Sequence, residues 1–305
     1  MKKRGMFFTI IAIYLISIFL LSYAIYFSVS DRSAINERVS SANSFVFALE
    51  RDMSKQVYIS GYRAIVSLEN YITENGIFIL DSENALKEAL LNGTVNSESV
   101  ELMEGYKIND WNSTISAFGN KVGLFVNYSI QEINVNQDNP WSIKIETLIH
   151  LIVKDKGNLV QWEKTEFIVS EIEINGFEDP LYLISTNGKI SNRINSSNFS
   201  SFVSGTDVSN LTLQCSNSYY IASALAPSFL DRLEGKTSSN PQGIESLVYV
   251  PELSAQGISA KDKSVVDYIY FSDLNPESSH ITGMPSWFKL DNAHLSIYNA
   301  TGLAY

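Results

Sequence analysis

Residues 6–27 have the sequence MFFTIIAIYLISIFLLSYAIYF, an uncharged and almost wholly apolar run that follows Lys2-Lys3-Arg4-Gly5 and precedes Asp31-Arg32. A helix rises about 1.5 Å per residue, so about 22 residues suffice to cross a hydrocarbon core of about 30 Å. The run therefore predicts a single-pass membrane anchor. Three cations before it and a balanced ion pair after it place the N-terminus in the cytoplasm and the bulk of the chain outside the cell membrane.

Two ordinary kinds of segment share this pattern. A cleaved secretory signal has an apolar core of about 7–15 residues and a small-residue cleavage site. The run here is longer, and Ser22-Tyr23-Ala24 is only a passable site. An uncleaved anchor fits both the length and the flanks.

A third interpretation depends on Lys3-Arg4-Gly5, which lies directly against the apolar run. This junction resembles the class III signal of type IV pilin-like proteins. The resemblance implies that a membrane peptidase cuts between Gly5 and Met6 and leaves the apolar helix as the mature N-terminus. The family's glutamate at the fifth mature position corresponds to Ile10 here, a departure that certain minor or tip subunits of the family share.

Composition describes a folded, acidic protein of 305 residues, 45% hydrophobic and 12% aromatic. Removing Lys2, Lys3 and Arg4 lowers the formal charge of −11 to −14 for the remainder. So acidic an external portion repels nucleic acid and anionic lipid headgroups, and we therefore predict no nucleic-acid partner. The predicted partners are the membrane, through residues 6–27, and other chains in a homo- or hetero-oligomer, through the helix over residues 35–72.

The single cysteine, Cys215, excludes an intrachain disulfide and is expected to be a small buried apolar residue. Asn-x-Ser/Thr sequons lie only beyond the membrane run, as external exposure requires. These candidate glycosylation sites are Asn92, Asn112, Asn127, Asn195, Asn198, Asn210 and Asn299.

Beyond the membrane run, apolar residues recur in steps of three and four from Ile35 to Ile72, which predicts one amphipathic helix about 60 Å long. Asn75-Gly76 is a good C-terminal cap. The stripe is expected to pack on the chain's own sheet, on another copy of the chain, or on both. The small residues Ser28, Ser30 and Ser33 leave room for a break before it.

Two short helices are predicted after it, one capped by Asp81 and one from Asp110 to about Phe118. The period then changes to two, predicting long antiparallel strands over residues 122–130, 141–153 and 159–174. The third strand's alternation slips twice, as bulges would cause. Asp179-Pro180-Leu181-Tyr182 is expected to be extended.

The predicted fold is α+β: an N-terminal transmembrane helix continues into a long amphipathic helix, packed on an antiparallel β-meander, with a C-terminal mixed α/β domain. The predicted segments are an anchor or class III signal (1–30), the long helix (31–76), an α+β domain (77–184), a Ser/Asn-rich linker (185–204) and the mixed domain (205–305). In the last we expect a helix near 218–233, interrupted or restarted by Pro227, strands at 244–250 and 265–271, and a helix near 291–298.

Helix plus meander is also the architecture of type IV pilins, although fold alone does not establish function. The segment Gly176–Tyr182 and the C-terminal third are similar to uncharacterised membrane-anchored proteins of archaea, which implies a lineage and no activity.

No motif commits the chain to a reaction. His280 and His294, with Asp273, Glu277 and Asp291 nearby, would form a metal site only if the fold brought them together. We therefore assign no catalytic residue, cofactor or metal. The sequence predicts a membrane-anchored extracytoplasmic surface protein with a structural or adhesive role, and the sharper form of this prediction is a minor pilin-like subunit. The alternative is a tethered ectodomain that binds or senses a ligand without polymerising.

Overall fold

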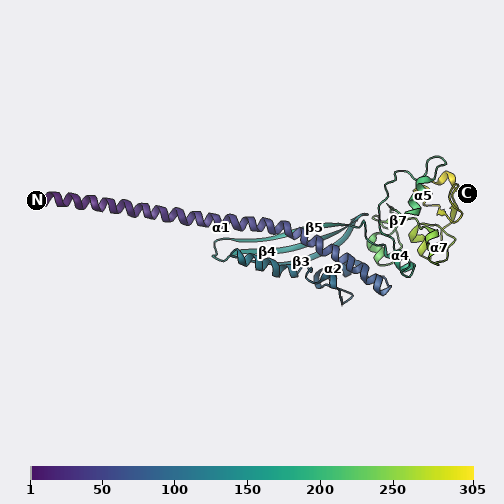
Figure 1. Cartoon of the computed structure of the whole chain (residues 1–305), viewed down its shortest axis with the longest axis horizontal. Coiled ribbons are helices and arrows are strands. Elements are labelled where there is room, and N and C mark those ends of the chain that lie inside the picture. The colour runs from purple at the N-terminus through teal and green to yellow at the C-terminus, as the bar shows by residue number, and fades with distance from the viewer. Residues whose placement is uncertain (1) are drawn as a thin grey trace.

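The computed structural model of the chain describes residues 2–305, with side chains for all of these except residues 2–6, 31 and 34. The molecule is elongated (Figure 1). One long helix, α1 (Lys2–Asn75), projects from one end; a three-stranded sheet packs along its second half, and a lobe of short elements forms the opposite end. The fold is α+β, and the predicted three-stranded meander is confirmed.

Helix α1 has two halves with different surroundings. Residues 7–30 are exposed on every side. From Ala42 onward one stripe is buried at steps of three and four, ending at Ile72. The helix is continuous through Ser28, Ser30 and Ser33, so there is no break at the small residues. It ends at Asn75, and Gly76 follows with a φ of 65°, the left-handed conformation that glycine tolerates best.

The meander consists of β3 (Leu124–Asn139), β4 (Ser142–Asp155) and β5 (Gln161–Glu173), all antiparallel. The expectation of bulges in the third strand was wrong. Pairing of β4 with β5 runs without a shift from Ser142–Glu173 to Lys154–Gln161, and the irregularities lie between β3 and β4. The alternation of β5 slips because Phe167 and Val169 face solvent, 63% and 45% exposed.

Close packing of α1 on the sheet depends on Gly61. A Cβ atom there would lie 2.4 Å from Ile145 Cδ1 and 2.5 Å from Ile172 Cδ1, far inside van der Waals contact. The missing side chain therefore lets the helix approach β4 and β5.

Both predicted short helices form. Helix α2 (Ser82–Asn92) is capped by Asp81, whose side chain accepts a hydrogen bond from Asn84 N, and α3 (Asp110–Lys121) packs on β3.

The remaining elements are short. Between α2 and α3 lie β1 (Thr94–Val95), β2 (Glu98–Ser99) and η1 (Glu101–Met103). The lobe, residues 177–305, contains α4 (Pro180–Ser185), α5 (Ser209–Ser216), β6 (Tyr220–Ala222), α6 (Phe229–Leu233), β7 (Ile244–Ser246), α7 (Val250–Ala255), α8 (Asp267–Phe271), β8 (Ser278–His280), β9 (Lys289–Asp291) and η2 (Thr301–Leu303).

Several local predictions for the lobe were wrong. Residues 180–185 form α4 instead of an extended segment, because Asp179 caps the helix and Pro180 suits its first turn. Of the helix expected over 218–233, residues 220–222 form strand β6 instead, and only the part after Pro227 is helical, as α6, which a capping box of Ser228 and Asp231 starts.

The apolar run 265–271, expected to be a strand, contains helix α8. Residues 289–291 form strand β9, and turns follow it where a helix was expected. Segment 186–204 has no helix, and its apolar residues Ile190, Ile194, Phe202 and Val203 are buried.

Apolar contacts join the lobe to the body formed by α1 and the sheet. The Phe177 ring lies 5.2 Å from that of Tyr62 on α1 and 6.1 Å from that of Phe229 on α6. Ile79 N also donates to Leu233 O at 2.9 Å. Phe229 and Leu233 belong to the same buried cluster as the stripe of α1, so the lobe shares a core with the body.

Candidate functional site: the projecting helix and a buried ion network

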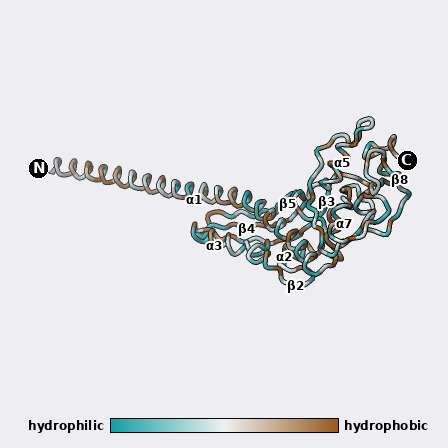
Figure 2. Tube along the Cα trace, turned by 45° about the vertical axis from the view of Figure 1, so that its right-hand side comes forward, coloured by the Kyte–Doolittle hydropathy of each residue, from teal (hydrophilic) through white to brown (hydrophobic). Residues whose placement is uncertain are grey.

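Residues 7–30 of α1, the projecting segment, form an apolar helix with no covering protein. Its side chains are exposed all round, including Phe8 (69%), Phe19 (71%) and Tyr26 (71%). Figure 2 shows this hydrophobic stretch extending away from the body. A helix that is apolar on every face needs an apolar environment. By length and composition, α1 contains a stretch able to span a membrane, which is compatible with single-pass anchoring.

The candidate processing residues lie where α1 begins. Gly5 and Met6 are helical, like the residues that follow. The structure describes only the backbone at these two positions. Ile10, at the position of the family's glutamate, is 56% exposed.

Most of the candidate glycosylation sites lie at the surface. Exposed side chains are those of Asn92, Asn127, Asn195, Asn198, Asn210 and Asn299. Asn112 differs, because its Nδ2 donates to Asn127 Oδ1 at 3.1 Å and to Tyr128 O at 3.3 Å. A glycan on Asn112 would displace these bonds between α3 and β3.

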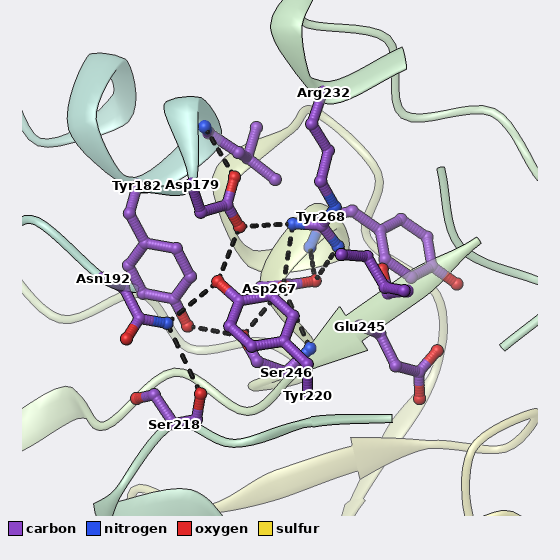
Figure 3. Close-up of polar contacts among 12 residues, drawn as sticks. Asp179, Tyr182, Asn192, Ser218, Tyr220, Arg232, Glu245, Ser246, Asp267 and Tyr268 are labelled. Carbon is purple, nitrogen blue, oxygen red and sulfur yellow. Dashed lines mark hydrogen bonds and ion pairs between the residues drawn. The ribbon is translucent and has the colours of Figure 1, made fainter. Parts of the chain in front are cut away.

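A charged network that no sequence motif had marked lies inside the lobe (Figure 3). The side chain of Arg232, on α6, is 0% exposed, as are those of Asp179 before α4 and Asp267 at the start of α8. Arg232 Nη1 lies 2.6 Å from Asp179 Oδ2 and 3.1 Å from Asp267 Oδ2. Arg232 Nη2 donates to Asp267 Oδ1 at 3.2 Å and to the carbonyl oxygen of Ile244.

Hydroxyl and backbone groups complete the coordination of both carboxylates. The Tyr220 hydroxyl donates to Asp179 Oδ2 at 2.7 Å. Both the backbone N and the hydroxyl of Ser246 donate to Asp267 Oδ2, at 2.9 and 2.8 Å. Burial raises the pKa of Asp179 more than the nearby Arg232 guanidinium lowers it.

A second charged group adjoins the first through β7. His294 Nδ1 lies 2.8 Å from both Asp291 carboxylate oxygens, and Nε2 lies 3.2 Å from Glu245 Oε2. Burial disfavours the imidazolium, but hydrogen bonds to the two carboxylates outweigh it and raise the pKa of His294 to about 10. His294 is therefore a cation at neutral pH. Its charge, with the Ser264 hydroxyl, holds the pKa of Asp291 below its usual value despite burial.

The geometry of these two buried charged groups fits a structural role better than a catalytic one. A substrate cannot reach Arg232, Asp179 or Asp267, since none is exposed. The fold does not join the two histidines considered as metal ligands: His280 stacks on Tyr305 at 5.7 Å, while His294 lies in the buried group. Among the side chains that the structure describes, no cluster of three or more His, Cys, Asp or Glu residues is suited to a metal ion.

A partly buried carboxyl, that of Glu69 on α1, links the body to the start of the lobe. Its Oε1 accepts from the backbone N of Glu178 at 3.0 Å. Burial raises the pKa of Glu69 to about 8, and the negative charges of Glu178 and Asp179 add to this, whereas the Glu178 backbone bond and Arg193 oppose it. Glu69 is thus largely protonated at neutral pH.

Comparison with known proteins identifies no relative: no protein-family model, curated protein or solved structure matches this chain.

We expect the Arg232→Met variant to lose about 3–5 kcal/mol of unfolding free energy, because it leaves buried carboxylates without their counter-charge. Arg193→Met is the matched control: its partner Glu178 is 3.9 Å away and its side chain is 69% exposed, so it should cost less than about 1 kcal/mol. Urea unfolding of the full chain in detergent, followed by tryptophan fluorescence, measures both. Similar losses for the two variants would contradict a stabilising network.

Stability should also fall as pH rises from about 4.5 to about 8. The folded chain keeps the Glu69 proton up to about pH 8, whereas the unfolded chain releases it near 4.5, so unfolding releases a proton over this interval. The Glu69→Gln variant should have a flatter dependence of the urea midpoint on pH. Glu74→Gln, an exposed change on the same helix, should leave the dependence as in the wild type; equal pH profiles for all three chains would refute the assignment.

Proposed function

We propose that the chain is a membrane-anchored extracytoplasmic surface protein with a structural or adhesive role. The observation that carries this proposal is the projecting segment, which is apolar on every face and continuous with the helix that organises the body. The acidic composition of the remainder suits an aqueous, extracytoplasmic location, and the cations at residues 2–4 suit a cytoplasmic N-terminus. In this orientation the lobe is the part presented farthest from the membrane (Figure 1).

The finer proposal is a minor pilin-like subunit, cleaved between Gly5 and Met6, whose projecting segment moves from the bilayer into a filament core. Contact between copies through residues 35–72 would use the faces of α1 that the sheet leaves open. The stripe from Ala42 to Ile72 is already covered by the chain itself. Phe47 (71%), Tyr58 (45%) and Tyr62 (47%) remain exposed on α1.

A tethered ligand-binding ectodomain is the second candidate, and one feature favours it. A groove of about 780 Å³ lies between α1 and residues 98–106, lined in part by Tyr71 and Tyr106. This volume lies within the range of about 300–1,000 Å³ that is common for ligand pockets. A protein of this kind would keep its N-terminus and remain unpolymerised.

The topology has a direct test with a membrane-impermeant maleimide. Cys215 is buried, and burial raises the pKa of its thiol, so the wild-type chain should be inert. The Thr206→Cys variant places a thiol at an exposed position of the lobe and should be labelled in intact cells. A cysteine inserted after Met1 of the Gly5→Leu variant, which keeps its N-terminal residues even if the wild type is processed, is the control and should react only after lysis. Protection of position 206 in intact cells would overturn the proposed orientation.

Processing has a separate test, the intact mass and N-terminal sequence of the purified chain. If the chain is pilin-like, it begins at Met6, and Gly5→Leu blocks the cut. Ala24→Leu alters the passable secretory site and should leave the cut in place. A mature chain that retains residues 2–5 would exclude the pilin-like subunit and leave the tethered ectodomain; a chain that begins after Ala24 would exclude the anchor.

A further inference from the structure

A groove of about 640 Å³ opens in the lobe where the chain leaves the sheet. Its lining residues are Asn175, Asn195, Ser196, Asn198, Phe199 and Tyr219, and we call it the asparagine groove. Every lining side chain is uncharged. An ionic ligand would therefore find no counter-charge in this lining, which favours a neutral, polar ligand.

The walls of the groove are held by backbone hydrogen bonds. Tyr220 N donates to Asn195 O at 2.8 Å, and Ser197 N donates to Tyr220 O at 2.7 Å. Ser196 N also donates to Asn175 Oδ1 at 3.2 Å, which ties the segment to the end of the sheet. The groove is thus preformed, and a ligand would not have to order a mobile loop on binding.

Two aromatic rings provide apolar surface inside this polar groove. The rings of Phe199 and Tyr219 lie 6.4 Å apart, tilted by 56°, and both residues are only partly buried. A pyranose ring carries apolar C–H faces edged by hydroxyl groups. Aromatic surface beside hydrogen-bonding groups matches that amphipathic shape.

Hydrogen-bonding capacity in the groove remains unused. Among the described residues, no other group of the protein hydrogen-bonds to the Asn198 amide or to the hydroxyl groups of Ser196 and Tyr219. An asparagine amide offers both donors and an acceptor, as neighbouring sugar hydroxyls require. Asn195 differs, because its Nδ2 donates to Arg193 O at 3.2 Å.

We propose that the asparagine groove binds a neutral oligosaccharide, with a sugar ring against Phe199 and Tyr219 and its hydroxyls bonded to Asn198 and Ser196. This inference rests on the proposed function, since it assigns the adhesive role of an outward-facing lobe to glycan recognition. Because Asn195 and Asn198 are also sequons, a glycan attached to the chain itself would fill the groove. The test therefore uses chain made in a host without N-glycosylation.

The experiment uses the full chain in phosphatidylcholine nanodiscs, which avoids detergents with sugar headgroups. Saturation-transfer NMR and calorimetric titration measure binding of chitotetraose, mannotetraose, maltotetraose and cellotetraose, with anionic sialyllactose as the charged control. We expect saturable binding of at least one neutral probe and none of sialyllactose. Asn198→Ala and Tyr219→Ala should each weaken that binding at least about tenfold, as expected for residues at the centre of a contact.

Matched variants separate binding from folding and from sequon loss. Tyr219→Phe keeps the ring and should lose less affinity than Tyr219→Ala. Ser200→Ala removes the Asn198 sequon without changing a lining residue, and Tyr58→Ala removes an exposed tyrosine of α1; both should bind like the wild type, with unchanged melting temperatures. Absence of saturable binding to all four neutral probes, or binding that Asn198→Ala and Tyr219→Ala leave intact, would overturn the proposal. Neither of these two results depends on whether the N-terminus is cleaved or on which side of the membrane the lobe lies. The labelling and N-terminal sequencing experiments therefore test the proposed function independently of glycan binding.

Discussion

Packing of the apolar stripe of α1 against the meander is the interaction on which the rest of the structure depends. A three-stranded sheet needs a covered apolar face to be stable in water. The inward side chains of β4 and β5, such as Ile145 and Ile172, obtain that cover from α1 around Gly61. Helix α2 and η1 also contact α1. One helix therefore organises the body, and its residues 7–30 extend beyond the body, exposed on every side.

The short elements of the lobe are held in place by a different kind of interaction. None of its helices is longer than the eight residues of α5, and its single cysteine excludes a disulfide within the chain. Short elements bury little apolar surface each, so their relative positions need other constraints. Arg232 supplies one, because its guanidinium joins Asp179, Asp267 and the Ile244 carbonyl from three separate segments. Buried ion pairs cost desolvation, and here the hydrogen bonds of both terminal guanidinium nitrogens offset that cost, whereas the buried Nε of Arg232 has no partner.

The sequence was most informative where a periodic pattern is long. The stripe from Ile35 to Ile72 and the alternation of 141–153 predicted α1 and β4, because many residues repeat the same preference. It was least informative in the lobe, where long-range contacts decide local structure. In the run 265–271, for example, the buried Asp267 receives hydrogen bonds from Ser246, and the backbone turns into α8.

The ion network itself lacks a local signal. Arg232 is separated by 53 positions from Asp179 and by 35 from Asp267, so no spacing rule connects them. One clue was available: Arg232 lies among the apolar residues Phe229, Leu230 and Leu233 of a short capped helix. A charged residue among apolar neighbours indicates either that the side chain lies at the edge of the buried face or that it has a buried partner of opposite charge. Only the folded structure distinguishes these two cases. Asn112 is a second example: the sequence shows its sequon, but it does not show that the side chain of Asn112 joins α3 to β3.

Phe177 connects the two parts of the molecule and thereby bears on function. It packs between Tyr62 of α1 and Phe229 of α6, and α6 also carries Arg232. The hydrophobic core of the body and the ion network of the lobe thus meet in one short helix. A lobe held in this way keeps a fixed position relative to α1, and α1 runs unbroken into the projecting segment. Such an arrangement suits a surface that must bear load or display a binding face, since neither task requires the lobe to move relative to its anchor.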